Sequence, residues 1–288
     1  MYKFTSLINL IEILKYIVLG LTQGIAEVLP ISSSGHLLLL SDILNINISL
    51  GDEVFLHLGS LIAVIIYMRK QLLSIFNNSL KYCFKKINNI FNKNKYPKSI
   101  ISTNEKNNFK LLIYLIISTI PLVIITILLN GYIESINCNL NCVGFLFLIN
   151  GLMVYITGKK MNLKKLNDIN KMSYYYALKI GLYQSFGIFS GISRSGTCLL
   201  GGSELQNEEN SNYAFLLFVP VCFGALVNEL IKGSINVTVN SLTAFIIVIP
   251  VTLFSLKILK KIITNNKYKL FGIYTFILGV IILIIKLF

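Results

Sequence analysis

The chain has 288 residues, of which 55% are hydrophobic and 13% are charged, and its formal net charge is +14. A mean hydropathy of +0.72 leaves too little polar surface to cover a water-soluble globule of this size. The composition therefore excludes a soluble enzyme and a disordered chain, and it indicates a polytopic membrane protein. No nucleic-acid partner is expected, because the cations fall in loops between apolar runs rather than on one face of a soluble fold.

Six apolar runs are predicted to cross the bilayer as helices, since about 20 apolar residues span its core. Two further apolar stretches, Leu7–Leu40 and Ala177–Leu200, are interrupted by Gly, Pro and Ser, so neither is predicted to be a simple span. In chain order, the six predicted spans are Val54–Met68, Leu111–Leu129, Val143–Thr157, Phe215–Leu230, Leu242–Leu256 and Leu270–Ile285.

The lysines and arginines predict the orientation of the chain in the membrane. They concentrate in three loops, Arg69–Lys110, Lys159–Lys179 and Lys257–Lys269, whereas the intervening loops are nearly free of them. Cytoplasmic loops of membrane proteins carry an excess of Lys and Arg, so these three loops are expected to be cytoplasmic. Such clusters also attract the headgroups of membrane lipids.

The two interrupted stretches are copies of one another. Residues 20–39 read GLTQGIAEVLPISSSGHLLL and residues 181–200 read GLYQSFGIFSGISRSGTCLL, with nine identities at a constant offset of 161. The next span keeps the same offset, because Val54 aligns with Phe215. The chain is therefore an internal repeat.

Each half consists of one interrupted segment and three spans. Because three is odd, the second copy is predicted to enter the membrane inverted relative to the first. We therefore expect an all-α polytopic fold with an inverted-topology repeat, in which two re-entrant helix–loop–helix hairpins enclose one polar cavity. The predicted organisation is a single integral membrane domain, 1–288, with half one at about 1–157, half two at about 177–288 and a basic cytoplasmic linker at 158–176.

Ionisable groups inside these segments are costly and are functional candidates. Arg194 is one of only two arginines among 26 basic residues, and it lies between two serines. A planar, bidentate donor at this position indicates a phosphate or carboxylate partner. The alternative interpretation is a structural ion pair with Glu27. Gln23 lies four residues before Glu27 on the same helix face, and this pair of oxygen donors could bind Mg²⁺ or Ca²⁺.

Two hydroxyl clusters accompany these charges. Residues 32–36 read SSSGH and their counterpart, residues 193–197, reads SRSGT. Backbone N–H groups, hydroxyls and helix N-termini in such runs converge on anions. His36 could serve as general base or acid and a serine as nucleophile, or the serines could simply cap helices. His57 is as compatible with packing as with catalysis.

Three motifs resemble those of the undecaprenyl-diphosphatase (bacitracin-resistance) family. Residues 23–27 match its (E/Q)xxxE, residues 30–36 (PISSSGH) its P-[VI]-S-S-[ST]-G-H, and residues 191–196 (GISRSG) its G-x-S-R-S-G. Weaker similarity extends over nearly the whole chain. Two departures stand out: Ser190 replaces the proline before the second motif glycine, and Cys198 stands where the family has threonine.

The resemblance implies hydrolysis of undecaprenyl diphosphate to undecaprenyl phosphate and inorganic phosphate, which recycles the lipid carrier for cell-wall synthesis and confers bacitracin resistance. By residue, it implies catalytic roles for Glu27, Ser33, His36 and Arg194, and a divalent-cation site for Mg²⁺ or Ca²⁺ at Glu27 and Gln23. It also implies diphosphate contacts from Ser32, Ser34, Ser193, Arg194, Ser195 and Thr197.

The implied partners are a polyprenyl diphosphate substrate and membrane lipids, and a homodimer is compatible with the sequence. The implied location is the bacterial plasma membrane, with an active site open to the external face. The competing interpretation is a secondary transporter or lipid-phosphate flippase, since an inverted repeat with broken helices is also typical of transporters. Release of phosphate from a prenyl diphosphate distinguishes the two.

Overall fold

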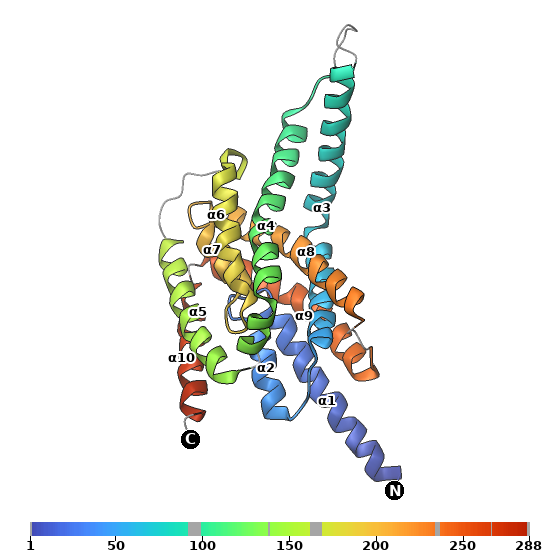
Figure 1. Cartoon of the computed structure of the whole chain (residues 1–288), viewed down its shortest axis with the longest axis vertical. Coiled ribbons are helices and arrows are strands. Elements are labelled where there is room, and N and C mark those ends of the chain that lie inside the picture. The colour runs from blue at the N-terminus through green and yellow to red at the C-terminus, as the bar shows by residue number, and fades with distance from the viewer. Residues whose placement is uncertain are drawn as a thin grey trace.

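The computed structural model describes residues 2–91, 99–137, 139–161, 169–233, 237–265 and 267–286, and no strand occurs within these ranges. The described part of the chain is folded into α-helices (Figure 1). The helices are α1 (Tyr2–Ala26), α2 (Ser33–Leu44), α3 (Leu50–Phe91), α4 (Thr103–Asn137), α5 (Leu140–Lys160), α6 (Tyr174–Ser185), α7 (Arg194–Gly201), α8 (Asn207–Lys232), α9 (Val239–Thr264) and α10 (Lys269–Ile285), with short 3₁₀ turns at Ile169–Lys171 and Phe186–Ile188.

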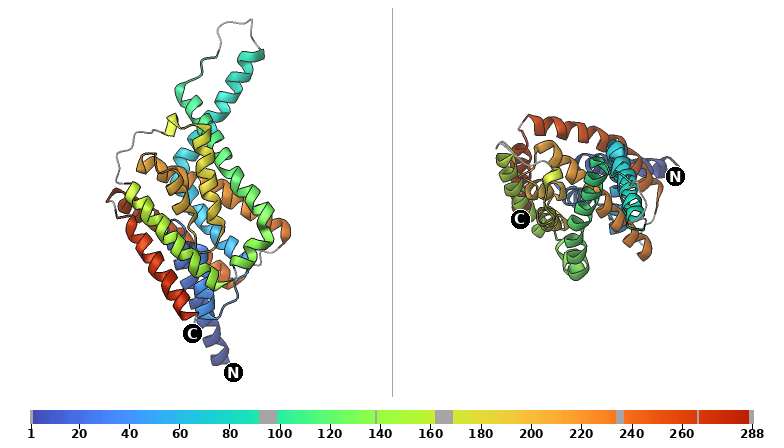
Figure 2. Two further views of the ribbon diagram at one scale, coloured as in Figure 1. Left: turned by 60° about the vertical axis from the view of Figure 1, so that its left-hand side comes forward. Right: turned by 90° about the horizontal axis from the view of Figure 1, so that it is seen from above.

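Each predicted span lies inside one of these helices. Five of them, α3, α4, α5, α8 and α9, are long and apolar enough to cross a bilayer, and α10 is a shorter apolar helix. The chain is therefore an all-α, multi-pass membrane protein. α3 continues well beyond the predicted end at Met68, and together with the start of α4 it extends past the rest of the bundle at the end opposite both termini (Figures 1 and 2).

The surface and the interior have the polarity expected of a protein dissolved in lipid. Large apolar side chains such as Ile127, Leu128 and Phe254 are exposed, while Gln23 and Asn150 are completely buried. Lipid tails solvate apolar side chains as well as a protein core does, so polar groups gather in the interior, where protein atoms satisfy them.

The two interrupted segments break at the predicted places. α1 ends at Ala26 and α2 begins at Ser33, with Pro30 in the turn, where its missing N–H and its ring stop the helix. Ser32 caps α2 by accepting a hydrogen bond from Gly35, and Ser193 caps α7 by accepting one from Gly196. The two serines occupy equivalent positions in the repeat, so both breaks use the same capping device.

α5 and α10 pack closely along a row of glycines. In α5 the glycines recur every seven residues at Gly144, Gly151 and Gly158, and in α10 they recur at Gly272 and Gly279. A Cβ on Gly272 would lie 2.7 Å from the carbonyl oxygen of Gly151. Small residues at this spacing keep one face of each helix free of side chains, so the backbones approach directly.

Glycines also set the contacts of α1 with α9 and of α6 with α4. A Cβ on Gly20 would lie 2.6 Å from the carbonyl oxygen of Ala244, and a Cβ on Gly181 would lie 2.5 Å from that of Ser118. Both glycines belong to the repeated sequence, and in both the missing side chain lets the backbone of a neighbouring helix pack directly against them.

We expect Gly20→Ala to destabilise the protein by about 1–3 kcal/mol, because the added methyl group collides with backbone that cannot rotate away. Gly224→Ala is the matched control, since nothing lies within 4 Å of a Cβ there. Thermal unfolding in detergent measures both. Equal midpoints for the two variants would contradict the close packing of α1 on α9.

Candidate active site

The turns of the two broken segments meet in the interior of the bundle. The backbone N–H of Gly191 donates to the Ser32 hydroxyl at 2.9 Å, which joins the second turn to the cap of the first. Gly191 has a φ of +104°, which a residue with a Cβ rarely adopts. A Cβ on Gly35 would also lie 2.8 Å from the backbone nitrogen of Gly191. Glycine is therefore needed on both sides of the contact.

Asn150, on α5, holds both turns at once. Its side-chain carbonyl accepts from the backbone N–H of Ser193 at 2.9 Å, and its amide donates to the carbonyl of Pro30 at 3.1 Å. One buried side chain thus satisfies a backbone group in each turn, where no water would otherwise do so. The sequence carried no signal for this role, since a single asparagine in an apolar run forms no motif.

Glu27 is the centre of the site and is almost fully buried. Its Oε1 lies 2.7 Å from Nη2 of Arg194, which comes from the other half of the chain. Its Oε2 accepts hydrogen bonds from the Ser33 hydroxyl at 2.6 Å and from the Gln23 amide at 2.9 Å. His57 Nδ1 lies 2.8 Å from the same oxygen. A buried carboxylate surrounded by donors in this way is held ionised in a fixed orientation.

Arg194 uses only part of its hydrogen-bonding capacity. Its guanidinium carbon lies 4.0 Å from the centre of the Phe218 ring on α8. Nη2 is bound to Glu27, while Nη1 is buried and has no hydrogen-bond partner among the described residues. A buried N–H without a partner is costly, and an anionic oxygen would satisfy it.

His57 belongs to this site, which the sequence left undecided. It lies on α3, and its second ring nitrogen, Nε2, is 3.7 Å from Glu53 one helical turn earlier. The His57 side chain is partly exposed, whereas that of Glu27 is buried, so the site is more open on the side of His57.

His36, on the same helix as Ser33, has a different set of partners. Its Nδ1 is 2.7 Å from the carbonyl oxygen of Ser32, and its Nε2 is 2.8 Å from the Tyr274 hydroxyl on α10. The ring also stacks on Tyr274 and meets Phe147 edge-on. Both nitrogens thus have partners other than Glu27, Ser33 or Arg194, so the structure does not bring His36 to the carboxylate.

The predicted hydroxyls divide into three groups. Ser33 is the one whose hydroxyl contacts Glu27. Ser32 and Ser193 cap their helices, as in the alternative interpretation of the serine runs. Three more predicted diphosphate ligands lie in the same first turns: Ser195, whose hydroxyl is 3.1 Å from that of Ser193, Thr197, which donates to the carbonyl of Arg194, and Ser34, which is partly exposed.

The predicted cation site has few protein ligands. Within the described ranges, no group of three or more His, Cys, Asp or Glu side chains has the arrangement of a metal site. Gln23 Oε1 is buried without a hydrogen-bond partner, so one oxygen donor beside Glu27 is unused. Both oxygens of Glu27 already have partners. The site therefore fits only an ion that takes most of its ligands from the substrate and water, as Mg²⁺ commonly does.

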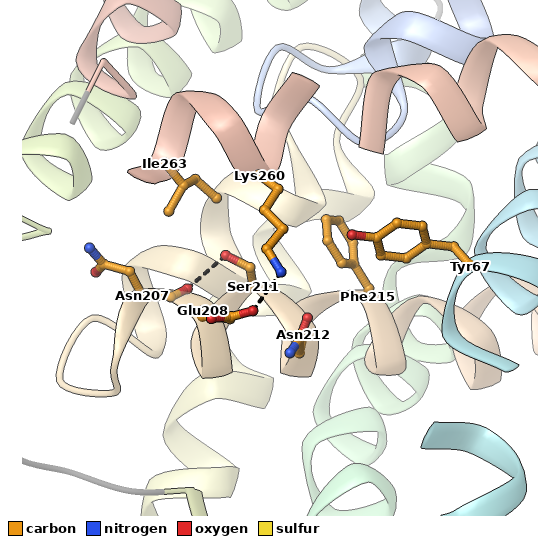
Figure 3. A pocket seen from close by; sticks show the side chains of 8 residues that line it. All are labelled: Tyr67, Asn207, Glu208, Ser211, Asn212, Phe215, Lys260 and Ile263. Atoms are coloured by element: carbon orange, nitrogen blue, oxygen red, sulfur yellow. Dashed lines mark hydrogen bonds and ion pairs between the residues drawn. The ribbon is translucent and has the colours of Figure 1, made fainter. Parts of the chain in front are cut away.

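A separate pocket of about 240 Å³ lies between α3, α8 and α9 (Figure 3). Its lining includes Tyr67, Phe215 and an exposed ion pair in which Lys260 lies 2.6 Å from Glu208. None of the predicted site residues lines it.

The fold and the site define a class: a multi-pass helical membrane protein in which two broken segments bring a carboxylate, a hydroxyl and a guanidinium together in the interior. The family model of the bacitracin resistance protein BacA matches residues 16–281 of the chain. The chain therefore belongs to the bacitracin resistance protein BacA family.

Curated relatives agree over almost the entire length. The chain is 37% identical over 272 residues to an undecaprenyl-diphosphatase of Thermosipho africanus, a match that covers 93% of this chain and 98% of that protein. It is 32% identical over 269 residues to an undecaprenyl-diphosphatase of Methanococcus maripaludis strain C7, with the same coverage. It is also 32% identical over 280 residues to undecaprenyl-diphosphatase 2 of Bacillus thuringiensis, covering 94% of this chain and 97% of that protein.

We expect Asn150→Leu to destabilise the protein by about 2–4 kcal/mol, because it leaves a buried N–H and a buried carbonyl without partners. Hydrogen–deuterium exchange should rise in both turns, residues 27–32 and 189–193. Asn108→Leu is the control, since that amide bonds only one turn back, to Asn104, at an exposed position. Faster exchange in one turn alone would contradict the bridging role.

Proposed function

We propose that this protein hydrolyses undecaprenyl diphosphate to undecaprenyl phosphate and inorganic phosphate, and so returns the lipid carrier to cell-wall synthesis. It is a phosphoric anhydride hydrolase of the membrane, and this activity accounts for bacitracin resistance. Family membership and the names of the curated relatives support the reaction. The observation that carries it in this chain is the Ser33 hydroxyl, bonded to the buried Glu27 carboxylate beside Arg194.

The contacts suggest how the reaction proceeds. The unpaired Nη1 of Arg194 is available to bind an oxygen of the terminal phosphoryl group, whose charge must be neutralised in the transition state. Glu27 Oε2 accepts the proton of Ser33 as the serine oxygen attacks the terminal phosphorus in line. The bond from that phosphorus to the bridging oxygen breaks, and undecaprenyl phosphate leaves with the electron pair. Water then attacks the phosphorus, the bond from that phosphorus to the serine oxygen breaks, Glu27 returns the proton to Ser33, and inorganic phosphate leaves.

The role predicted for His36 as general base or acid stays a prediction. Its nitrogens bond to the carbonyl of Ser32 and to Tyr274, so we propose Glu27 as the group that accepts the proton of Ser33. His36 then acts on the orientation of the first turn of α2. The remaining predicted diphosphate ligands, Ser34, Ser195 and Thr197 among them, also stay predictions.

We also propose the inverted repeat. The repeat makes α1 equivalent to α6 and α4 equivalent to α9. In the structure α1 of the first half packs on α9 of the second, and α6 of the second half packs on α4 of the first. Gly20 and Gly181, equivalent in sequence, lie in these two contacts. The α1–α2 hairpin opens toward the end that holds both termini and the α6–α7 hairpin toward the opposite end (Figure 1). These observations support halves at about 1–157 and 177–288 in one domain, with a basic linker at 158–176.

The orientation follows from the lysines. Cytoplasmic placement of the three basic loops puts the start of α3, and with it Glu53 and His57, on the external side of the plasma membrane. The partial exposure of His57 supports a site that opens to that face. A homodimer stays a prediction.

Purified protein in detergent should release phosphate from a long-chain prenyl diphosphate. Glu27→Gln and Ser33→Ala should each lower kcat by about 10²–10⁴, because they remove the base or the nucleophile. Arg194→Lys should lower kcat/KM by about 10–100-fold, since a point charge replaces the planar donor.

Glu208→Gln is the matched control, because it removes a carboxylate from an exposed ion pair in the second pocket, and it should leave turnover nearly unchanged. Absence of phosphate release by the unmodified protein would exclude the enzyme and favour transport. Full activity of Ser33→Ala would exclude the covalent step but not hydrolysis by water. Normal kcat in His36→Ala would exclude its predicted role in proton transfer.

We propose that a divalent cation, Mg²⁺ or Ca²⁺, assists the reaction, with Gln23 and Glu27 as the protein ligands. When bound, the ion would neutralise charge on the diphosphate. EDTA should abolish phosphate release and added Mg²⁺ or Ca²⁺ should restore it, and Gln23→Ala should raise the cation concentration needed for half-maximal rate. Unchanged turnover in EDTA would contradict this proposal.

A further inference from the structure

Two residues that the reaction scheme does not use stand in equivalent positions of the repeat. The offset of 161 that aligns Gly20 with Gly181 also aligns His57 with Phe218. His57 lies on α3 and Phe218 lies on α8, the first long helix after each hairpin. Each contacts one member of the Glu27–Arg194 ion pair.

Phe218 contacts the guanidinium of Arg194. It is almost completely buried, and the centre of its ring lies 4.0 Å from the guanidinium carbon of Arg194. The negative face of an aromatic ring attracts a cation, most strongly where water is excluded. A ring that contacts the guanidinium carbon does not occupy the N–H groups, because these point outward in the guanidinium plane. Arg194 can therefore contact the ring and still bond to Glu27 through Nη2, while Nη1 is available for a phosphoryl oxygen.

His57 contacts the carboxylate of Glu27. Its Nδ1 lies 2.8 Å from Glu27 Oε2, the same oxygen that accepts the Ser33 hydroxyl at 2.6 Å. A donor at this position fixes the rotation of the carboxylate, so that Oε2 stays directed at Ser33. The groups that face His57 are Gln23 from α1, Glu27 from the turn that follows α1, and Glu53 from its own helix.

We propose that His57 and Phe218 are paired positioning residues: α3 uses a hydrogen-bond donor to orient the Glu27 carboxylate, and α8 uses an aromatic ring at the equivalent position to orient the Arg194 guanidinium. The two copies of the repeat have thus diverged to hold opposite charges. This inference rests on the proposed function, because it concerns the same carboxylate and guanidinium.

The first test separates Phe218 from ordinary packing. Phe218→Leu keeps an apolar side chain of similar size but removes the aromatic face, so Arg194 loses its orientation toward substrate. KM for the prenyl diphosphate should rise by about 5–30-fold with a smaller change in kcat. Phe218→Tyr, which keeps the ring, should restore most of the affinity.

Phe215→Leu is the matched control. It makes the same substitution on the same helix three residues earlier, where the ring packs edge-on against Tyr67 instead of a cation. Its KM should stay at the unmodified value. Thermal unfolding of all variants identifies any loss caused by misfolding. A similar rise in KM for Phe215→Leu and Phe218→Leu, or no rise for Phe218→Leu, would overturn the inference for α8.

The second test concerns His57. His57→Leu should lower kcat by about 10–100-fold with little change in KM, because a misdirected carboxylate slows attack more than it weakens binding. His57→Gln keeps an N–H donor toward Glu27 and should recover most of the loss. Equal kcat in the Leu and Gln variants would overturn the inference for α3.

The two levels of proposal fail in different ways. If the unmodified protein releases no phosphate, the proposed function is wrong and the inference falls with it. Suppose that the unmodified protein is active, that KM does not depend on an aromatic ring at position 218, and that kcat does not depend on an N–H donor at position 57. In that case only the inference is wrong.

Discussion

The ion pair between Glu27 and Arg194 is the interaction on which the rest of the site depends. Its partners are 167 positions apart, one in each half of the chain, and their oxygen and nitrogen lie 2.7 Å apart. Neither charge could be buried alone in a protein surrounded by lipid, because an unpaired ion there costs several kcal/mol. The pair can form only if both broken segments end in the same place, so the geometry of the two turns determines whether there is a site at all.

The surrounding structure fixes those two turns. Asn150 bonds to one backbone group in each, and α5, which carries it, is packed on α10 along glycines whose backbones nearly touch. Ser32 and Ser193 cap the returning helices, and the bond from Gly191 to Ser32 joins the turns. Most of these contacts involve backbone atoms. They therefore depend on helix positions more than on the side chains that carry out the chemistry, which lets the two copies differ at their functional positions.

The parts of the fold that can be predicted from the sequence are those that depend on local sequence patterns. Long apolar runs predict the membrane helices, and Pro30 and the serine runs predict that both segments are broken. The sequence places Ser33–His36 in the first loop, but α2 already begins at Ser33, because Ser32 caps it. Contacts between distant segments left no such pattern. Asn150 and Phe218 look like ordinary residues of apolar helices until the other half of the chain is placed beside them. His57 was ambiguous because its partner Glu27 lies 30 positions earlier, beyond a turn. His36 is close to Ser33 in sequence, but Tyr274 on α10 supplies its partner instead.

The bond between Arg194 Nη2 and Glu27 Oε1 has a consequence for the resting protein. The carboxylate proposed to take the serine proton is bonded to the same guanidinium that is proposed to receive the substrate. In the proposed scheme Nη1 binds a phosphoryl oxygen while Nη2 stays on Glu27, so one cation contacts both the substrate and the base. A substitution at Arg194 would therefore be expected to affect substrate binding and the orientation of the Glu27 carboxylate together.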